Sequence, residues 1–431
     1  MTARLEGGLL LGAAALAGLG LTLVKLASGS GPDATVGLSM MTVALTFLGL
    51  QALIRRTAPG ASPLLLPPVA LITVFGLIMI YRLDPARAAL QRWWLVIGAG
   101  LAAVGVIWLS RAGTETLRRY RYLLLLASLG LLALPALPSE GPLPVKGYAV
   151  NGSRLWVRVD LGIVELNLQP AELAKVLLVV FLAAYLADRQ PALSGARRRL
   201  GRVRVPEPRQ LLPLAVVWAG SLLVLVAQRD LGASLLLFGV FVAMLYAATG
   251  ERGYLVAGGM LAGAAAVVAW YAFDHVRVRV EAWLRPFADF EGSGYQIAQG
   301  LFGMASGSLA GSGPGVGRPD LVPNASTDFI FAAVAEEFGF AGSVAVLCLY
   351  ALTVAVAFGI ALRSRDRFRK LLATGLGFTV GFQTFLIIGG VLRVVPLTGI
   401  TLPFMSYGGS SLLGNFLIIG LLAVVSHEES T

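Results

Sequence analysis

The sequence predicts an all-α protein: a polytopic bundle of membrane-spanning helices with a large loop on the extracytoplasmic side. Three observations support this fold class. Hydrophobic residues make up 57% of the chain, and charged residues make up 13%, where a soluble domain carries about 25%. The mean hydropathy is +0.80. Apolar runs of about 20 residues, the length needed to cross the hydrocarbon core, recur along the chain.

Twelve stretches qualify as membrane spans. The first two are 7–27 and 36–54. The other ten are 64–81, 93–110, 121–137, 169–187, 211–227, 231–249, 254–273, 330–361, 371–391 and 403–425. A signal peptide is the alternative for the first stretch, but its single early arginine, Arg4, is offset by Glu6, so a span is favoured.

The distribution of positive charge predicts the orientation. If the N-terminus is cytoplasmic, 20 of the 34 Lys and Arg residues fall in cytoplasmic segments, as the positive-inside rule requires. Both termini are then cytoplasmic, and the long connections 138–168 and 274–329 lie outside. The net charge of +11 therefore reflects topology and a face suited to anionic membrane lipids, and no nucleic-acid partner is expected. Cys348 is the single cysteine, so no internal disulfide is expected. The two histidines, His275 and His427, are far apart in the sequence, so no His/Cys metal cluster is expected.

Polar residues at or near membrane depth are the candidates for function, because burying them is costly. "QPAELAKVLL" places Glu172 and Lys175 three residues apart near a helix start, as either a buried ion pair or a functional pair. "NGSRLWVRVD" places Arg154 and Arg158 just outside the membrane. Arg393 lies at the outer end of a span, where it could bind a ligand or extend to the interface.

Two further segments can be interpreted as structural or as functional. In "TDFIFAAVAEEFG", Asp328 is expected to cap a helix before it serves chemistry. The glycine-rich "GSGPGVGRPD", 311–320, looks like a phosphate-cradling loop, but it lacks the P-loop lysine and the strand context, so nucleotide binding is disfavoured. The small residues 406–411 of the last span suit close helix approach.

Asp289, in "RPFADFEGSGYQ", is the candidate for catalysis. Arg285 lies four residues before it, but Pro286 and the glycines at 292 and 294 argue against a regular helical ion pair. A carboxylate held at the outer surface beside cationic groups suits general-base chemistry on an amphiphilic substrate.

These motifs together resemble the shape, elongation, division and sporulation family, the RodA and FtsW proteins. "NGSRLW", "QPAELAK", "DLGAS", "GSGYQIAQGL", "TDFIFAAVAEEFG" and "LPFMSYGGSS" occur in the family's order and at family-like intervals. The resemblance runs from about Pro67 to the C-terminus, and it implies a ten-span core. It therefore divides the chain into an N-terminal two-span extension, 1–62, and a glycosyltransferase core, 63–431, with 274–329 as the catalytic loop. The extension and "GLIMIYRLD" look more like RodA than FtsW.

The family resemblance implies a peptidoglycan glycosyltransferase, in the bacterial cytoplasmic membrane, that polymerises lipid II on its outer side for cell elongation or division. Its catalytic aspartate falls on Asp289. Four basic residues are the candidates to hold the undecaprenyl pyrophosphate leaving group: Arg154, Lys175, Arg285 and Arg393. A divalent cation, Mg or Mn, is the alternative source of positive charge. The expected protein partner is a class B penicillin-binding protein.

This chain departs from the family's usual pattern at several positions. Phe290 stands where proline is usual, Arg393 and Ile387 replace a usual glycine and asparagine, and Arg229 replaces a usual proline. Two other functions stay open on sequence grounds: a lipid II flippase or transporter, and a non-catalytic scaffold of the cell-wall machinery. A helical bundle with polar residues at mid-depth would suit a transporter, whereas an intact Asp289 argues against a scaffold.

Overall fold

The chain is described here by a computed structural model. The residues described are 3–139, 144–150, 153–160, 165–195, 197–200, 203–206, 219–220, 223, 226 and 230–430. The chain divides into two compact units. The first comprises Met1–Trp108, Val268–Val356 and Gln383–Thr431, and the second comprises Leu109–Val267 and Ala357–Phe382.

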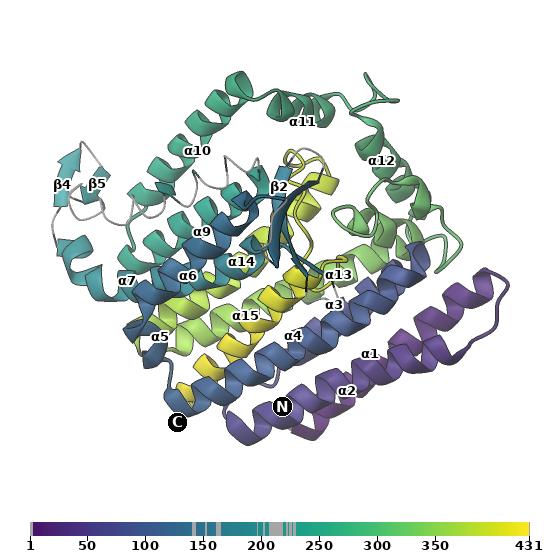
Figure 1. Cartoon of the computed structure of the whole chain (residues 1–431), viewed down its shortest axis with the longest axis horizontal. Coiled ribbons are helices and arrows are strands. Elements are labelled where there is room, and N and C mark those ends of the chain that lie inside the picture. The colour runs from purple at the N-terminus through teal and green to yellow at the C-terminus, as the bar shows by residue number, and fades with distance from the viewer. Residues whose placement is uncertain are drawn as a thin grey trace. The chain divides into compact units, whose positions relative to one another are not determined.

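The first unit begins with an antiparallel helical hairpin, α1 (Ala3–Ala27) and α2 (Ala34–Thr57), visible in purple in Figure 1. An ion pair of 2.5 Å between Glu6 and Arg55 joins the two helices at one end of the hairpin. Helix α1 also packs on α3 (Leu66–Leu83), where a Cβ on Gly20 would collide with Ile78. The small residue therefore allows the two helices to approach closely.

Helices α4 (Pro85–Ala112) and α15 (Gly409–Glu428) pack together in the same unit. A Cβ on Gly420 would lie 3.3 Å from the carbonyl oxygen of Ala102, so the two backbones run close to each other. The ring of Phe416 on α15 packs against Phe404 and Phe47, with centroids 5.6 and 6.0 Å away. The unit also contains α11 (Asp274–Leu284), α12 (Tyr295–Gly307) and the 3-10 turn η2 (Pro319–Leu321).

Helix α13 (Ile330–Arg363) is kinked at Gly339, whose φ of 65° and ψ of −165° are not helical. The kink frees backbone groups that a lipid environment cannot satisfy. The glycine-rich loop supplies the partners: the amides of Ser312 and Gly313 donate to the carbonyls of Glu336 and Glu337, at 2.9 and 3.0 Å. The loop thus satisfies the backbone carbonyls that the kink leaves without helical partners.

The second unit contains most of the remaining helices. They are α5 (Glu115–Arg119), α6 (Arg121–Ala133), the 3-10 turn η1 (Leu134–Ala136), α7 (Ala171–Gly195), α9 (Leu231–Thr249), α10 (Gly253–Ala272) and much of α14 (Arg367–Val391). The Ser128 hydroxyl of α6 donates to the carbonyl of Ala174 in α7, at 3.0 Å. A Cβ on Gly375 of α14 would touch Val179 of α7 and Met244 of α9, so these three helices share a core.

A three-stranded antiparallel sheet, which the all-α prediction did not include, lies between α6 and α7 in the chain. Its strands are β1 (Val145–Val150), β2 (Ser153–Asp160) and β3 (Glu165–Leu168), in the order β1-β2-β3. The stretch alternates apolar residues with polar or basic ones, which suits a half-buried strand. A second hairpin pairs β4 (Arg197–Leu200) with β5 (Val203–Pro206).

The helical, multi-pass prediction is confirmed, with changes at individual spans. Among the described residues, nine helices are long and apolar enough to cross a membrane. The span predicted at 121–137 is the shorter α6 followed by η1, and the one predicted at 211–227 lies mostly outside the described residues. The last span was predicted to begin at 403, but α15 begins at Gly409. The Tyr350 hydroxyl donates to the carbonyl of Pro403 at 2.6 Å, in the turn that precedes the helix.

Candidate functional site

Asp289 lies in a turn between α11 and α12, and its side chain is exposed. Its Oδ2 accepts hydrogen bonds from the backbone amide of Ser293 at 2.7 Å and from the Ser293 hydroxyl at 2.8 Å. These bonds, the amide first, hold the pKa of the Asp289 carboxyl below its ordinary value because they stabilise the charged form. The carboxylate is therefore anionic at neutral pH, as a general base must be.

Two glycines make this turn sterically possible. A Cβ on Gly292 would collide with the carboxylate oxygens of Asp289, and one on Gly294 would collide with the carbonyl of Pro286. The backbone amide of Gly294 also donates to the carbonyl of Asp289, at 3.0 Å. The glycines noted in the sequence thus allow the chain to fold tightly around the carboxylate.

The carboxylate opens into a cleft of about 410 Å³. Glu281 and Arg285 line this cleft with Asp289, together with Ala282, Leu284, Ala288 and Ser293. The structure thus brings the predicted Arg285 to the same cleft as Asp289. In the described part of the chain no ion pair joins the two side chains. Arg285 remains available to an anionic ligand.

Arg393, predicted as a ligand for the leaving group, is engaged with the end of α11. Its Nε donates to the carbonyl of Trp283 at 3.0 Å, and a terminal nitrogen donates to the carbonyl of Leu284 at 3.2 Å. In return the indole Nε1 of Trp283 donates to the carbonyl of Arg393 at 2.9 Å. Arg279 on α11 donates to the carbonyl of Thr398 at 3.3 Å. We call this set of contacts the α11 clamp; it fixes the helix that leads directly into the Asp289 turn.

Asp328 does not cap α13 as the sequence suggested. The helix begins at Ile330, and the Asp328 carboxylate accepts from the Thr327 hydroxyl at 3.0 Å. Next to it, the Ser326 hydroxyl accepts from Arg87 at 2.9 Å. Burial raises the pKa of Asp328, and the hydrogen bond from the Thr327 hydroxyl opposes that shift. This segment is tied to α12, because Gln296 donates to the carbonyl of Pro323 at 3.0 Å.

The glycine-rich segment 311–320 is not an anion cradle. Its amides at Gly315 and Arg318 donate to the carboxylates of Glu337, at 2.8 Å, and Glu336, at 2.6 Å. The Arg82 Nε completes the shell of the fully buried Glu337, at 3.0 Å. The donors that a phosphate would need are therefore occupied by the chain's own carboxylates.

Arg154 and Lys175 belong to the second unit. Lys175 is buried and paired with Glu172, Nζ to Oε2, at 2.5 Å, which supports the buried-pair interpretation. Arg154 is exposed on β2 and, by strand alternation, shares a face with Trp156 and Arg158. Arg158 lies 3.7 Å from the carboxylate of Glu165.

Comparison with known proteins identifies the family to which this chain belongs. The family model described as FTSW_RODA_SPOVE, cell cycle protein, matches residues 63–431. The chain belongs to this family. It is 43% identical to peptidoglycan glycosyltransferase RodA of Mycobacterium tuberculosis over 401 residues, which cover 91% of this chain and 82% of the relative. It is 31% identical to stage V sporulation protein E of Bacillus subtilis, over 86% of this chain and 98% of the relative.

Solved structures of this FtsW/RodA/SpoVE family have the same fold. A chain in a peptidoglycan synthase complex that coordinates polymerization and crosslinking matches with a TM-score of 0.65 and 29% identity, over 86% of this chain and 98% of that one. RodA of Thermus thermophilus matches with a TM-score of 0.57 and 27% identity, over 86% and 97%. The family match therefore rests on both sequence and fold.

Against the family's usual pattern, two substituted positions have visible contacts. The Phe290 ring, where proline is usual, packs on Tyr295 and Phe302 with centroids 5.8 and 6.1 Å away, and so anchors the turn to α12. Arg393 supplies the α11 clamp, which a glycine could not. Arg229 lies outside the described residues.

The two other polar residues of the cleft, Ser293 and Glu281, were not identified from the sequence. Ser293 could have been found locally, since an aspartate in a turn commonly accepts from the backbone a few residues on. Glu281 carries no such signal, because its place in the cleft depends on how the Asp289 turn folds back against α11.

Proposed function

We propose that this chain is a peptidoglycan glycosyltransferase that polymerises lipid II, with Asp289 as the general base. The observation that carries the proposal is the Asp289 carboxylate, held anionic by Ser293 and opening into a 410 Å³ cleft that Arg285 also lines. Peptidoglycan glycosyltransferase is the activity named for its RodA relatives, which supports the reaction class.

In the proposed reaction, the 4-hydroxyl of the acceptor sugar gives its proton to Asp289 and attacks the anomeric carbon of the donor. The glycosidic bond forms as the bond to undecaprenyl pyrophosphate breaks, with inversion at that carbon. Because the base abstracts the proton only as the new bond forms, its position relative to the acceptor matters more than its strength. The Ser293 hydrogen bonds supply that positioning.

Negative charge develops on the pyrophosphate, and preorganised cations stabilise it. Arg285 is the best supported of the four candidates, because it lines the cleft and makes no ion pair in the described structure. Arg393 instead acts through the α11 clamp. Arg154 presents an exposed guanidinium beside the aromatic face of β2, suited to a phosphate or a sugar. Lys175 is already neutralised by Glu172, so binding a phosphate would require that pair to open.

A divalent cation remains a proposal for the same charge. Among the described residues, no group of three or more His, Cys, Asp or Glu could hold a metal ion. Mg²⁺ commonly binds through one or two carboxylates together with substrate phosphates, which fits a cleft lined by Glu281 and Asp289. Glu281 would be the protein ligand, leaving Asp289 as base, and the ion would offset the charge of the leaving pyrophosphate.

We propose further that the protein lies in the bacterial cytoplasmic membrane with the cleft facing outward and both termini in the cytoplasm. The distribution of Lys and Arg supports this orientation. We propose a class B penicillin-binding protein as partner, because a similar chain occurs in a peptidoglycan synthase complex that couples polymerization to crosslinking.

The deciding experiment gives purified protein, with its penicillin-binding partner, labelled lipid II and resolves the products on a gel. Wild type is expected to form glycan polymer, and Asp289→Asn is expected to form almost none. Lipid II movement across proteoliposomes is measured on the same two proteins. Polymer formation by Asp289→Asn would remove Asp289 as base, whereas loss of lipid movement with intact polymerisation would favour the transporter hypothesis.

A further inference from the structure

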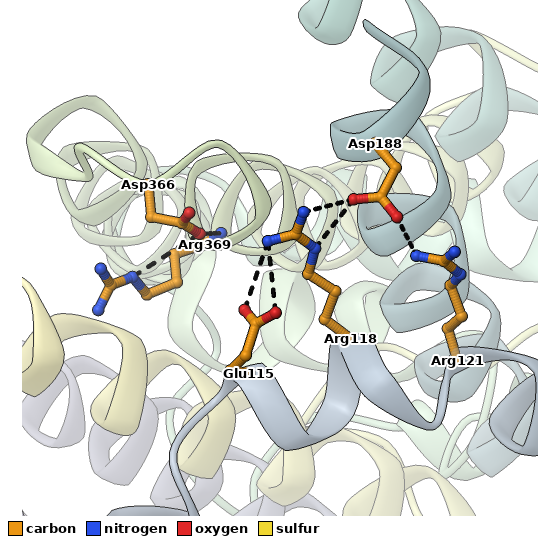
Figure 2. A network of polar contacts seen from close by, with 6 residues as sticks. All are labelled: Glu115, Arg118, Arg121, Asp188, Asp366 and Arg369. Carbon is orange, nitrogen blue, oxygen red and sulfur yellow. Dashed lines mark hydrogen bonds and ion pairs between the residues drawn. The ribbon is translucent and has the colours of Figure 1, made fainter.

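Five arginines gather in the second unit where α5, α6, α7 and α14 have their charged ends; we call Arg118, Arg119, Arg121, Arg367 and Arg369 the arginine cluster. Asp188 of α7 lies between two of them, with its Oδ1 2.5 Å from Arg118 and its Oδ2 in contact with Arg121 (Figure 2). Glu115 pairs with Arg118 at 3.4 Å, and Asp366 pairs with Arg369 at 3.8 Å. Within the described structure, five arginines thus face three carboxylates in this cluster.

A cavity of about 580 Å³ opens beside the Arg118–Asp188 pair. Its charged lining is Glu115, Arg118, Arg119, Arg121 and Asp188, and Tyr122 and Thr116 are also part of the wall. This volume lies in the range of small-molecule sites, which is about 300–1,000 Å³. Three guanidinium groups and two carboxylates leave one net positive charge on the wall.

The cationic groups of this wall are not all satisfied by the chain itself. Arg119 stacks over the ring of Tyr120 at 5.7 Å and makes no ion pair in the described part of the chain. Arg121 is already in contact with Asp188, whereas Arg119 is exposed on the cavity wall. An exposed guanidinium on a wall of net positive charge suits an anionic ligand with acceptor oxygens, of which a phosphate is the natural example.

The position of the cavity identifies the kind of phosphate. It lies where α4 ends at Ala112 and α6 begins at Arg121, at the boundary of apolar helices. Tyr122 of the cavity wall and Leu126, four residues on, share one face of α6, and both side chains are exposed. An apolar face that continues from a cationic cavity suits a lipid whose headgroup and acyl chain are joined, and tyrosine is enriched at such interfaces.

We propose that this cavity binds the phosphate headgroup of an anionic glycerophospholipid, with an acyl chain lying along Tyr122 and Leu126 of α6. Arg119 holds the phosphate, while Arg118 and Arg121 keep their contacts with Asp188. The site is independent of the proposed glycosyltransferase activity, since it uses none of the residues of the Asp289 cleft.

The test measures lipid binding to the purified, detergent-solubilised full chain by native mass spectrometry, titrating phosphatidylglycerol or zwitterionic phosphatidylcholine. Wild type is expected to retain phosphatidylglycerol selectively. Each basic residue near an anionic headgroup contributes about 1 kcal/mol, so Arg119→Gln is expected to weaken that binding about fivefold. Glu115→Gln removes an opposing carboxylate and is expected to tighten it.

Arg363→Gln is the matched control, because Arg363 is exposed at the end of α13 and lines no wall of this cavity. It is expected to bind phosphatidylglycerol like wild type. An equal loss in Arg363→Gln and Arg119→Gln, or equal retention of the two lipids by wild type, would overturn the site. Glycerol phosphate, added as a competitor, distinguishes a lipid headgroup from a free phosphate as the ligand. If glycerol phosphate binds as tightly as the lipid, the ligand is a free phosphate and the lipid assignment is wrong. Thermal unfolding of each variant checks that it is folded.

Discussion

The side chain at position 289 shows how one residue can be exposed and yet held in a fixed orientation. The Asp289 carboxylate lies at the surface, but one of its oxygens receives two hydrogen bonds from Ser293. A base held in this way loses little conformational freedom when it meets its substrate, which is what proximity effects require. The same bonds lower the pKa of the Asp289 carboxyl, so the carboxylate is charged at neutral pH and would be a weak base in the proposed reaction.

Replacing Asp289 with asparagine keeps the size and hydrogen-bonding capacity of the side chain and removes its charge. Loss of a general base typically costs about 10²–10⁴-fold in rate, so polymerisation in the gel assay is expected to fall by that factor while folding and partner binding persist. The matched control is Glu291→Gln, which removes one exposed carboxylate two residues away and is expected to have a mild effect. A similar fall in both variants would point to general loop electrostatics instead of a base.

Ser293→Ala tests the origin of the lowered pKa of Asp289. Removing the hydroxyl deletes one of two bonds that stabilise the carboxylate, so the pKa of Asp289 is expected to rise toward the ordinary aspartate value of about 3.9. In the wild type, the lowered pKa keeps the carboxylate charged down to lower pH. In Ser293→Ala the pKa is higher, so the acid limb of the pH–rate profile is expected to shift to higher pH. The check is that profile, with Ser308→Ala as a distant control. An unshifted limb would mean that the Ser293 hydroxyl does not stabilise the carboxylate.

At the residue scale, the sequence could predict Asp289 and the glycines beside it, because a turn of that composition is local. It could not predict that Arg393 serves α11. That role arises from a contact between residues 110 positions apart, for which no local pattern exists.

At the scale of elements, the α11 clamp fixes the end of the helix that leads into the Asp289 turn. Arg393 has a φ of 58°, a conformation disfavoured for a residue with a side chain, and its guanidinium binds the last carbonyls of α11. Carbonyls at a helix end lack partners within the helix, so a cationic side chain there satisfies them.

Arg393→Gly relieves the backbone but deletes the two guanidinium bonds of the clamp, and Arg393→Lys keeps the charge without the forked geometry. Both variants are expected to lower kcat for lipid II polymerisation more than they raise KM, with Gly the more severe, because the clamp orients the base and does not hold substrate. A steady-state analysis of the two variants makes the check. A rise in KM alone would restore the prediction that Arg393 binds the leaving group.

Gly339→Ala probes the kink of α13. At φ 65° an added Cβ is strained, and it would also collide with the backbone of Gly311. Strain of this kind costs about 1–3 kcal/mol, so the midpoint of thermal unfolding in detergent is expected to fall. Gly359→Ala is the control on the same helix, since nothing lies within 4 Å of its Cβ position. Equal midpoints for the two variants would show that the kink does not depend on glycine.

The helices were predictable as elements because hydropathy over about 20 residues is a strong signal. The sheet β1–β3 was not, because its strands are short and lie in a long connection between apolar spans. The kink of α13 was also hidden, since a single glycine inside an apolar run is compatible with a straight helix.

At the scale of the whole molecule, the N-terminal hairpin of α1 and α2 is expected to contribute to stability and not to the proposed activity. Helix α1 packs on α3, and Arg92 of α4 donates to the Ser39 hydroxyl of α2 at 2.9 Å. A chain that begins near Ser62 exposes this surface of α3 to lipid tails, which are themselves apolar, so the cost in a membrane is smaller than it would be in water. We expect the truncated protein to unfold at a lower temperature and still to polymerise lipid II. A stable but inactive truncation would show that residues 7–54 contribute to the active site.

The orientation of the molecule decides whether Asp289 can meet an extracytoplasmic substrate, and cysteine labelling in intact cells measures it. Cys348 of α13 is the one native cysteine, so both variants are made in a Cys348→Ala background, which leaves a single thiol to label. In that background, Glu291→Cys is expected to react with a membrane-impermeant maleimide added outside, because position 291 lies in the exposed turn beside Asp289. Arg198→Cys, in the arginine-rich connection assigned to the cytoplasm, is expected to react only after the membrane is permeabilised. The reverse pattern would place the Asp289 cleft on the cytoplasmic side, where an acceptor strand outside the membrane could not reach it.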